Sequence, residues 1–265
     1  MINLLKSDFY RLRKSSVLKI SLISMTLIIL LLNILFLSED NFLAINRAFM
    51  NDRFYGFTMG DIVGNESYIK FFYSTVSLSP FIIIIILFLV VDMVISRYKN
   101  GTLKNVISYG HSRSKIYLAN IITIFIGVAI IIIFTLVVSM GILSVIFQSK
   151  DALTKDIIVE VLKATGIWII ILSTIASIYS LLATIIKNKA VIATFGALYT
   201  FLGTALIIEK WGNYLFDKEP SFMILDFAAK PINNPLFSTW IINCLIIIVV
   251  TNILGCIVFN KQEIK

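Results

Sequence analysis

The stretch PFIIIIILFLVVDMVISR at residues 80–97 decides the fold class, because a long run of hydrocarbon side chains is interrupted by one acid and ends at a base. Around it, the chain of 265 residues is 58% hydrophobic and only 14% charged. A soluble domain of this length needs far more polar surface to cover its core. Crossing a bilayer takes about 20 apolar residues in a helix. The sequence therefore predicts an all-α integral membrane protein.

Six apolar runs are bounded by charged residues or by Gly, Pro or Asn, and we expect each to form a transmembrane helix. They cover residues 17–37, 74–96, 118–147, 164–186, 190–208 and 237–259. The third run is longer than the hydrocarbon layer, so it must tilt or project beyond it. The outer connections are residues 38–73, 148–163 and 209–236. Since none of them is a low-complexity linker, residues 1–265 form a single predicted transmembrane domain.

The net charge of +8 is distributed unevenly between the two sides of the predicted membrane. Basic residues dominate the N-terminal tail, the loop at 97–117, the turn at Lys187 to Lys189 and the C-terminal tail. Because basic loops stay in the cytoplasm, we expect both termini inside the cell. High Ile, Lys and Asn usage favours a bacterial source, and hence a bacterial cytoplasmic membrane. No aromatic-basic stacking pattern accompanies these charges, so nucleic-acid binding is not expected.

The N-terminal tail has the pattern of an amphipathic helix. Four apolar residues lie within about 80° of one another on a helical wheel: Ile2, Leu5, Phe9 and Leu12. Basic residues occupy the remaining surface. Residues 1–16 therefore predict a helix lying in the membrane interface. The alternative is a basic topology signal with scattered apolar residues.

Motifs of known catalytic sites do not occur in this sequence. His111 is the only histidine, which excludes multi-histidine metal sites, and it is expected to be an ordinary exposed side chain. There is no His-Glu-x-x-His, Gly-x-Ser-x-Gly or Gly-x-x-x-x-Gly-Lys-Ser/Thr motif, so this chain has no recognisable means of binding ATP. Cys244 and Cys256 lie on different faces of one predicted helix. We expect no catalytic, cofactor-binding or metal-ligating residue, and a chain that is not an enzyme.

Asp92 is the one acid within a predicted span. Acids inside membranes are costly and often functional, for example in proton relays. Its position near the end of the run, with Arg97 and Lys99 following, favours a structural acid paired with a basic neighbour. A proton carrier, or an intramembrane enzyme using Asp92 or His111, is the weaker alternative.

The loop at 97–117 contains the signals of a short helix. Thr102 is expected to cap its start, after Gly101 releases the chain from the second span. Leu103, Val106 and Ile107 form one apolar stripe at helical spacing, and Gly110 follows where a helix end favours a left-handed residue. A topology signal requires the basic residues but not the stripe. The apolar stripe therefore predicts docking, either into a groove of another protein or onto the membrane surface.

This combination resembles the membrane subunits of type-2 ABC transporters, the ABC exporter permeases. The resemblance is carried by Asp92, by Gly101-Thr102-Leu103 and by His111-Ser112-Arg113 before the third span. The six-span outline with both ends inside also agrees with that family. One departure is Asn120, where family members often have a lysine. Within the family, the chain looks most like permeases of lantibiotic or bacteriocin immunity and of bacitracin-type resistance.

The resemblance implies a cytoplasmic coupling helix at about residues 101–109 that fits a cleft on a separate ATP-binding subunit. Implied contact residues are Gly101, Thr102, Leu103, Val106, Ile107, Tyr109 and Arg113. ATP and Mg would bind to that partner, and a second permease chain, identical or not, would complete the transporter in contact with membrane lipid. The implied substrate is an amphipathic antimicrobial peptide or a lipid-like molecule moved outward. The alternative is a non-transporting membrane anchor or sensor component.

Overall fold

The computed structural model describes residues 1–38, 48–50, 53–55, 67–99, 101–147, 153–199, 218–227 and 235–262. Over these residues the chain is helical apart from one short antiparallel hairpin, so the predicted all-helical class is confirmed. Four helices are long and apolar enough to cross a membrane: α4 (Ser79–Lys99), α6 (Arg113–Phe147), α7 (Lys155–Ile186) and α11 (Leu236–Lys261). A fifth candidate is the pair α1 (Ile2–Lys14) and α2 (Ser16–Ser38), which bends by 48° at the break between them.

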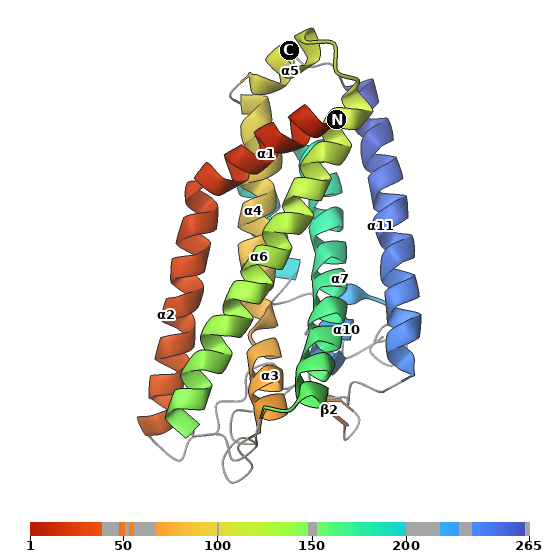
Figure 1. The fold of residues 1–265 in the computed structure, drawn as a ribbon. Coiled ribbons are helices and arrows are strands. Elements are labelled where there is room, and N and C mark those ends of the chain that lie inside the picture. The colour runs from red at the N-terminus through yellow and green to blue at the C-terminus, as the bar shows by residue number, and fades with distance from the viewer. Residues whose placement is uncertain are drawn as a thin grey trace.

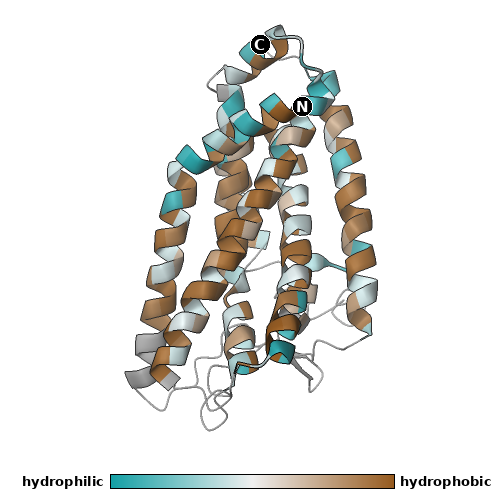
Figure 2. Cartoon of the chain, viewed as in Figure 1, coloured by the Kyte–Doolittle hydropathy of each residue, from teal (hydrophilic) through white to brown (hydrophobic). Residues whose placement is uncertain are grey.

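The long helices pack side by side, and α1 crosses one end of the bundle (Figure 1). The same end holds α5 (Thr102–Ser108), the start of α6 and the end of α11. The opposite end holds α3 (Tyr68–Val76) and the hairpin of β1 (Ala48–Met50) and β2 (Arg53–Tyr55), in which Phe49 lies opposite Phe54. Hydrophilic residues collect at the two ends, and apolar residues fill the length between them (Figure 2).

Several boundaries of the predicted spans are corrected by the structure. The second span does not begin at residue 74, because Ser77 and Leu78 separate α3 from α4. Pro80 lacks a backbone N–H and is favoured in a first helical turn, which explains a new helix there. The helix that contains the fourth predicted span, 164–186, begins already at Lys155, because the Thr154 hydroxyl caps it by accepting from the Ile157 N–H (3.4 Å). Part of the expected outer loop 148–163 is therefore helical.

The described part of the fifth predicted span is α8 (Lys189–Leu198). It follows Lys187, which has a left-handed backbone (φ 54°), and Asn188, whose side chain accepts from the Ala190 N–H (3.0 Å). The predicted tight turn is thus present, and α8 packs on α4 and α7. The rest of the run to residue 208 lies outside the described residues. Within the outer segment 209–236, the structure describes α10 (Pro220–Phe227).

The face of α1 that turns inward differs from the expected apolar stripe. Leu4, Asp8 and Leu12 are buried, whereas Ile2 and Phe9 are exposed. The inward face packs on α6, and the exposed apolar edge is free to lie in a membrane interface.

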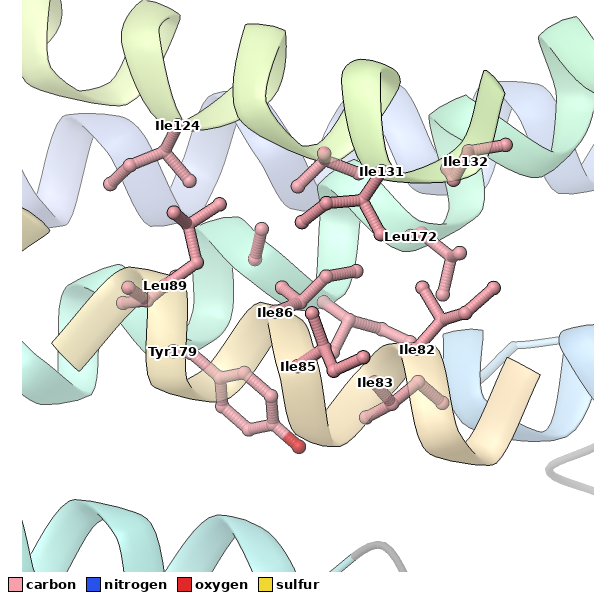
Figure 3. Packing of buried hydrophobic residues seen from close by; sticks show 14 of the residues in the cluster. Ile82, Ile83, Ile85, Ile86, Leu89, Ile124, Ile131, Ile132, Leu172 and Tyr179 are labelled. Carbon is pink, nitrogen blue, oxygen red and sulfur yellow. The ribbon is translucent and has the colours of Figure 1, made fainter. Parts of the chain in front are cut away.

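Branched aliphatic side chains fill the space between α4, α6 and α7 (Figure 3). Ile82, Ile86 and Leu89 of α4 lie against residues of α6 and α7, including Ile131 and Leu172. Since lipid tails are as apolar as these residues, close packing and hydrogen bonds between helices must hold the bundle together. Hydroxyl pairs provide such bonds: Thr75 donates to Ser139 (2.9 Å) and Thr251 to Ser177 (3.0 Å).

Gly255 of α11 lies against the side chain of Tyr117 of α6. A Cβ at this position would overlap the hydroxyl group and ring of Tyr117, which is itself buried. Only glycine therefore lets Tyr117 lie against the backbone of α11.

We expect Gly255→Ala to lower the free energy of unfolding by about 1–3 kcal/mol, because an added methyl group in a filled contact forces side chains to shift. Thermal unfolding of the purified protein in detergent measures this as a lower midpoint. Gly141→Ala is the matched control, since nothing lies within 4 Å of a Cβ there. An unchanged midpoint for Gly255→Ala would contradict the packing described.

Candidate functional site

Helix α5 is joined to its neighbours by two glycines in the left-handed conformation. Gly101 has φ 66° and Gly110 has φ 81°, a region that residues with a side chain rarely adopt. The left-handed Gly110 confirms the expected helix end. Gly101, and not Thr102, is the N-cap residue, which corrects the predicted cap. The Thr102 hydroxyl instead donates to the Arg97 carbonyl oxygen (3.4 Å).

The apolar stripe of α5 faces its own chain. Leu103 is only 3% exposed, and Val106 and Ile107 are half-buried against the core. The stripe therefore attaches α5 to the bundle, and a partner would meet the other side of the helix. That outer face carries exposed side chains: Thr102, Lys104, Asn105, Ser108 and Tyr109. The Tyr109 side chain is 81% exposed.

Arg113, one of the predicted contact residues, binds the end of α11. It donates to the carbonyl oxygens of Asn260 (3.0 Å) and Gln262. Gln262 is also held by Tyr98, whose hydroxyl donates to its Oε1 (2.9 Å). Its Nε2 donates to the Thr184 carbonyl oxygen (2.7 Å). The last turns of α4 and α7 and the first turn of α6 are thus joined to the end of α11, at the end of the bundle that holds α5.

Asp92 has hydrogen-bond partners in its own helix and in the break between α1 and α2. It accepts hydrogen bonds from Ser15 (2.9 Å) and from Ser96 (3.1 Å). Ser96 in turn accepts from Nζ of Lys189 (2.7 Å), which joins α8 to the group. Arg11 of α1 is a cation close to Asp92, whereas the expected partner, Arg97, pairs with Asp8. Satisfied hydrogen bonds and a nearby cation are what a structural acid requires inside a membrane.

Arg97 forms an ion pair with Asp8 of α1, and the two side chains are 11% and 5% exposed. Arg11 donates to the Met93 carbonyl oxygen and to Oδ1 of Asn120 (3.3 Å). These side chains form one polar cluster: Asp8, Arg11, Ser15, Asp92, Ser96, Arg97, Asn120 and Lys189.

Glu219 is a second enclosed acid, which sequence reasoning did not single out. Its Oε2 accepts from the Phe222 N–H (3.0 Å), capping α10, and Tyr199 donates to its other oxygen. The sequence does contain a signal for this cap: a Glu directly before Pro220, since proline favours the first position of a helix. Burial raises the pKa of Glu219 above its ordinary value, although these hydrogen bonds oppose the shift.

His111 is half-buried, which differs from the exposed side chain expected. Cys244 and Cys256 are both free thiols, and Sγ of Cys244 lies 3.8 Å from Sδ of Met223. Within the part of the chain that the structure describes, no group of three or more His, Cys, Asp or Glu side chains could hold a metal ion.

We expect Asp8→Asn and Arg97→Gln each to lower the free energy of unfolding by about 3 kcal/mol, because either change leaves a buried charge without its partner. The double variant should lose less than the sum of the two single losses. Equilibrium unfolding in mixed micelles measures all three, and Lys6→Gln on the exposed side of α1 is the control. Additive losses in the double variant would show that the two side chains do not interact.

We expect Glu219→Gln to flatten the pH dependence of thermal stability. Since the pKa of Glu219 is raised in the folded protein, lowering the pH protonates the carboxyl group and removes the cost of burying its charge. The native protein should therefore gain stability relative to Glu219→Gln as the pH falls from about 7.5 toward about 4.3, the ordinary value for Glu. A difference between the two melting midpoints that stays constant over this window would refute the assignment.

Comparison with known proteins gives one family. A family model described as a protein of unknown function, DUF2705, matches residues 26–265, which covers every helix after the first turns of α2. Among curated proteins, no significant match to the chain was found. The match extends over most of the sequence, and the chain therefore belongs to the DUF2705 family.

Proposed function

We propose that this chain is the membrane-spanning permease subunit of an ATP-driven exporter of the type-2 ABC class. The observation that carries the proposal is the placement of α5. It is a short helix at one end of the bundle, set between two spanning helices, delimited by left-handed Gly101 and Gly110, and anchored through Leu103. A helix fixed in this way, with a polar outer face, is suited to receive a partner and to pass its motion to α4 and α6.

The proposed topology has six spans, formed by α2, α4, α6, α7, the segment that begins with α8, and α11. Both termini lie in the cytoplasm. In support, α1, α5 and the end of α11 lie at the same end of the bundle (Figure 1). The exposed side chains that the structure describes at that end and that are charged at neutral pH are all basic: Lys6, Arg13, Lys14, Lys19, Lys104, Lys115 and Lys261. Such a basic end favours the cytoplasmic side of a bacterial membrane.

In the proposed mechanism, a separate subunit binds ATP and Mg and contacts the outer face of α5. Closure of that subunit around ATP displaces α5, and the attached helices follow as a unit, because packed helices move between discrete arrangements. The polar cluster transmits this movement to α1, since Asp8 and Arg11 bind the last turns of α4. A second permease chain completes the path across the membrane.

The proposed substrate is an amphipathic peptide, such as a lantibiotic or bacteriocin, or a lipid-like molecule. The spanning helices expose almost purely apolar surfaces to their surroundings, as the outward residues of α11 illustrate: Ile242, Leu245, Ile246, Val249, Val250, Ile253, Leu254 and Ile257. A hydrophilic ion would find no ligands there, whereas an amphipathic molecule can move along such a surface. On this proposal the chain itself is not an enzyme.

We expect the double variant Lys104→Glu/Tyr109→Ala to lose co-purification with the ATP-binding subunit and ATP-dependent export, with at least a tenfold drop in each. Both side chains are exposed on α5, so folding and membrane insertion should be unaffected. Lys155→Glu/Leu162→Ala, on exposed positions of α7, is the matched control.

Binding that survives in the α5 variant would contradict the proposed docking face. A different result would favour the anchor or sensor role. In that case the variant loses binding, but the native complex moves neither peptide nor lipid when ATP is supplied.

A further inference from the structure

An apolar groove of about 490 Å³ runs between α6 and α11 on the outside of the bundle. This volume falls within the range of ordinary ligand sites, roughly 300–1,000 Å³. Its walls are mainly branched aliphatic and aromatic side chains, among them Leu118, Ile122, Phe125, Val249, Ile253 and Ile257. Asn252 lies partway along it, with its Nδ2 donating to the Ile248 carbonyl oxygen of its own helix (2.8 Å). The groove is therefore suited to a hydrocarbon chain.

One end of the groove is polar and positively charged. Asn260 lines it there, and its Nδ2 donates to the Ser114 hydroxyl (2.9 Å) across the two helices. Lys115 precedes Ile122 by seven residues, so the two lie within about 20° on the surface of α6. Lys261 follows Ile257 by four residues, within about 40° on α11. Each wall of the groove therefore ends in an exposed lysine.

We propose that this groove binds one anionic phospholipid, with an acyl chain between α6 and α11 and the headgroup phosphate between Lys115 and Lys261. Neither lysine has a carboxylate partner among the residues that the structure describes. Lys115 lies in the first turn of α6 and Lys261 is the last residue of α11, at the end of the bundle that also holds α1 and α5, where the headgroups of a membrane leaflet would be (Figure 1). Lysines near an anionic headgroup each strengthen binding. The inference is independent of the exporter proposal.

A lipid fits this groove better than a second copy of the same chain. A symmetric contact between two copies presents the same surface from each side. Across this groove, such a contact would bring two Lys115 and two Lys261 side chains together, and like charges at a contact oppose binding. A phosphate group between Lys115 and Lys261 instead offsets the repulsion between these two lysines of one chain.

The test is native mass spectrometry of the delipidated full-length protein with phosphatidylglycerol, which is anionic, or phosphatidylcholine, which is zwitterionic. We expect selective phosphatidylglycerol binding that falls about 25-fold in Lys115→Gln/Lys261→Gln, because each lysine contributes about fivefold. Lys155→Gln/Lys163→Gln makes the same charge change on exposed residues of α7 and should bind as the native protein does. Equal binding of the two lipids, or equal losses in both variants, would overturn the proposal.

A second measurement tests the groove itself. Ile122→Trp fills it and should remove phosphatidylglycerol binding, whereas Ile133→Trp, on an exposed position of α6 outside it, should not. The native Cys256 thiol lines the groove and reports on a protein occupant. Oxidation in membranes that yields a dimer linked through Cys256, absent in Cys256→Ser, would show that a second copy covers the groove and would refute the lipid site.

Discussion

The ion pair between Asp8 and Arg97 fixes the end of the bundle on which the proposed function depends. Both side chains are almost fully enclosed, and an enclosed charge is stable only when it is paired. Arg97 stands in the last turns of α4, just before the chain enters α5. The pair therefore holds α1 against the end of α4, at the point where the chain continues from α4 into α5.

Around this pair, apolar burial and hydrogen bonds hold other helix ends at the same side of the bundle. Leu103 attaches α5 by burial, Arg113 binds the last carbonyl groups of α11, and Lys189 reaches Ser96 from α8. Backbone groups inside a membrane are satisfied within helices, so polar bonds between helices concentrate where the chain leaves the hydrocarbon. These contacts join the helix ends below an outer surface that carries polar and basic side chains.

The sequence predicts the long helices well, since hydropathy and charge alone determine them. The starts and ends of α2 and α11 lie within two residues of expectation. The break before α4 and the early start of α7 depend on single residues, Pro80 and Thr154, whose local effect a hydropathy run conceals. Periodicity correctly identified the apolar stripe containing Leu103, but it cannot tell whether such a stripe faces a partner or its own chain.

Which residues pair with each other in the polar cluster could not be predicted from the sequence either. Asp8 and Arg97 are far apart along the chain, and only tertiary packing brings them together. The sequence favours a structural acid at Asp92 that is paired with a following basic residue, yet its neighbours Ser15 and Arg11 come from the N-terminal segment rather than from the basic loop after it.

The most direct test of the account is the position of Tyr109, exposed on the outer face of α5. Tyr109→Cys, made after Cys244 and Cys256 are replaced by serine, is treated with a membrane-impermeant maleimide and a short thiol-to-amine cross-linker. The account predicts labelling in inside-out vesicles but not in intact cells, and a cross-link to a subunit carrying a Gly-x-x-x-x-Gly-Lys-Ser/Thr loop. Labelling of intact cells, or no cross-link when that subunit is present, would contradict it.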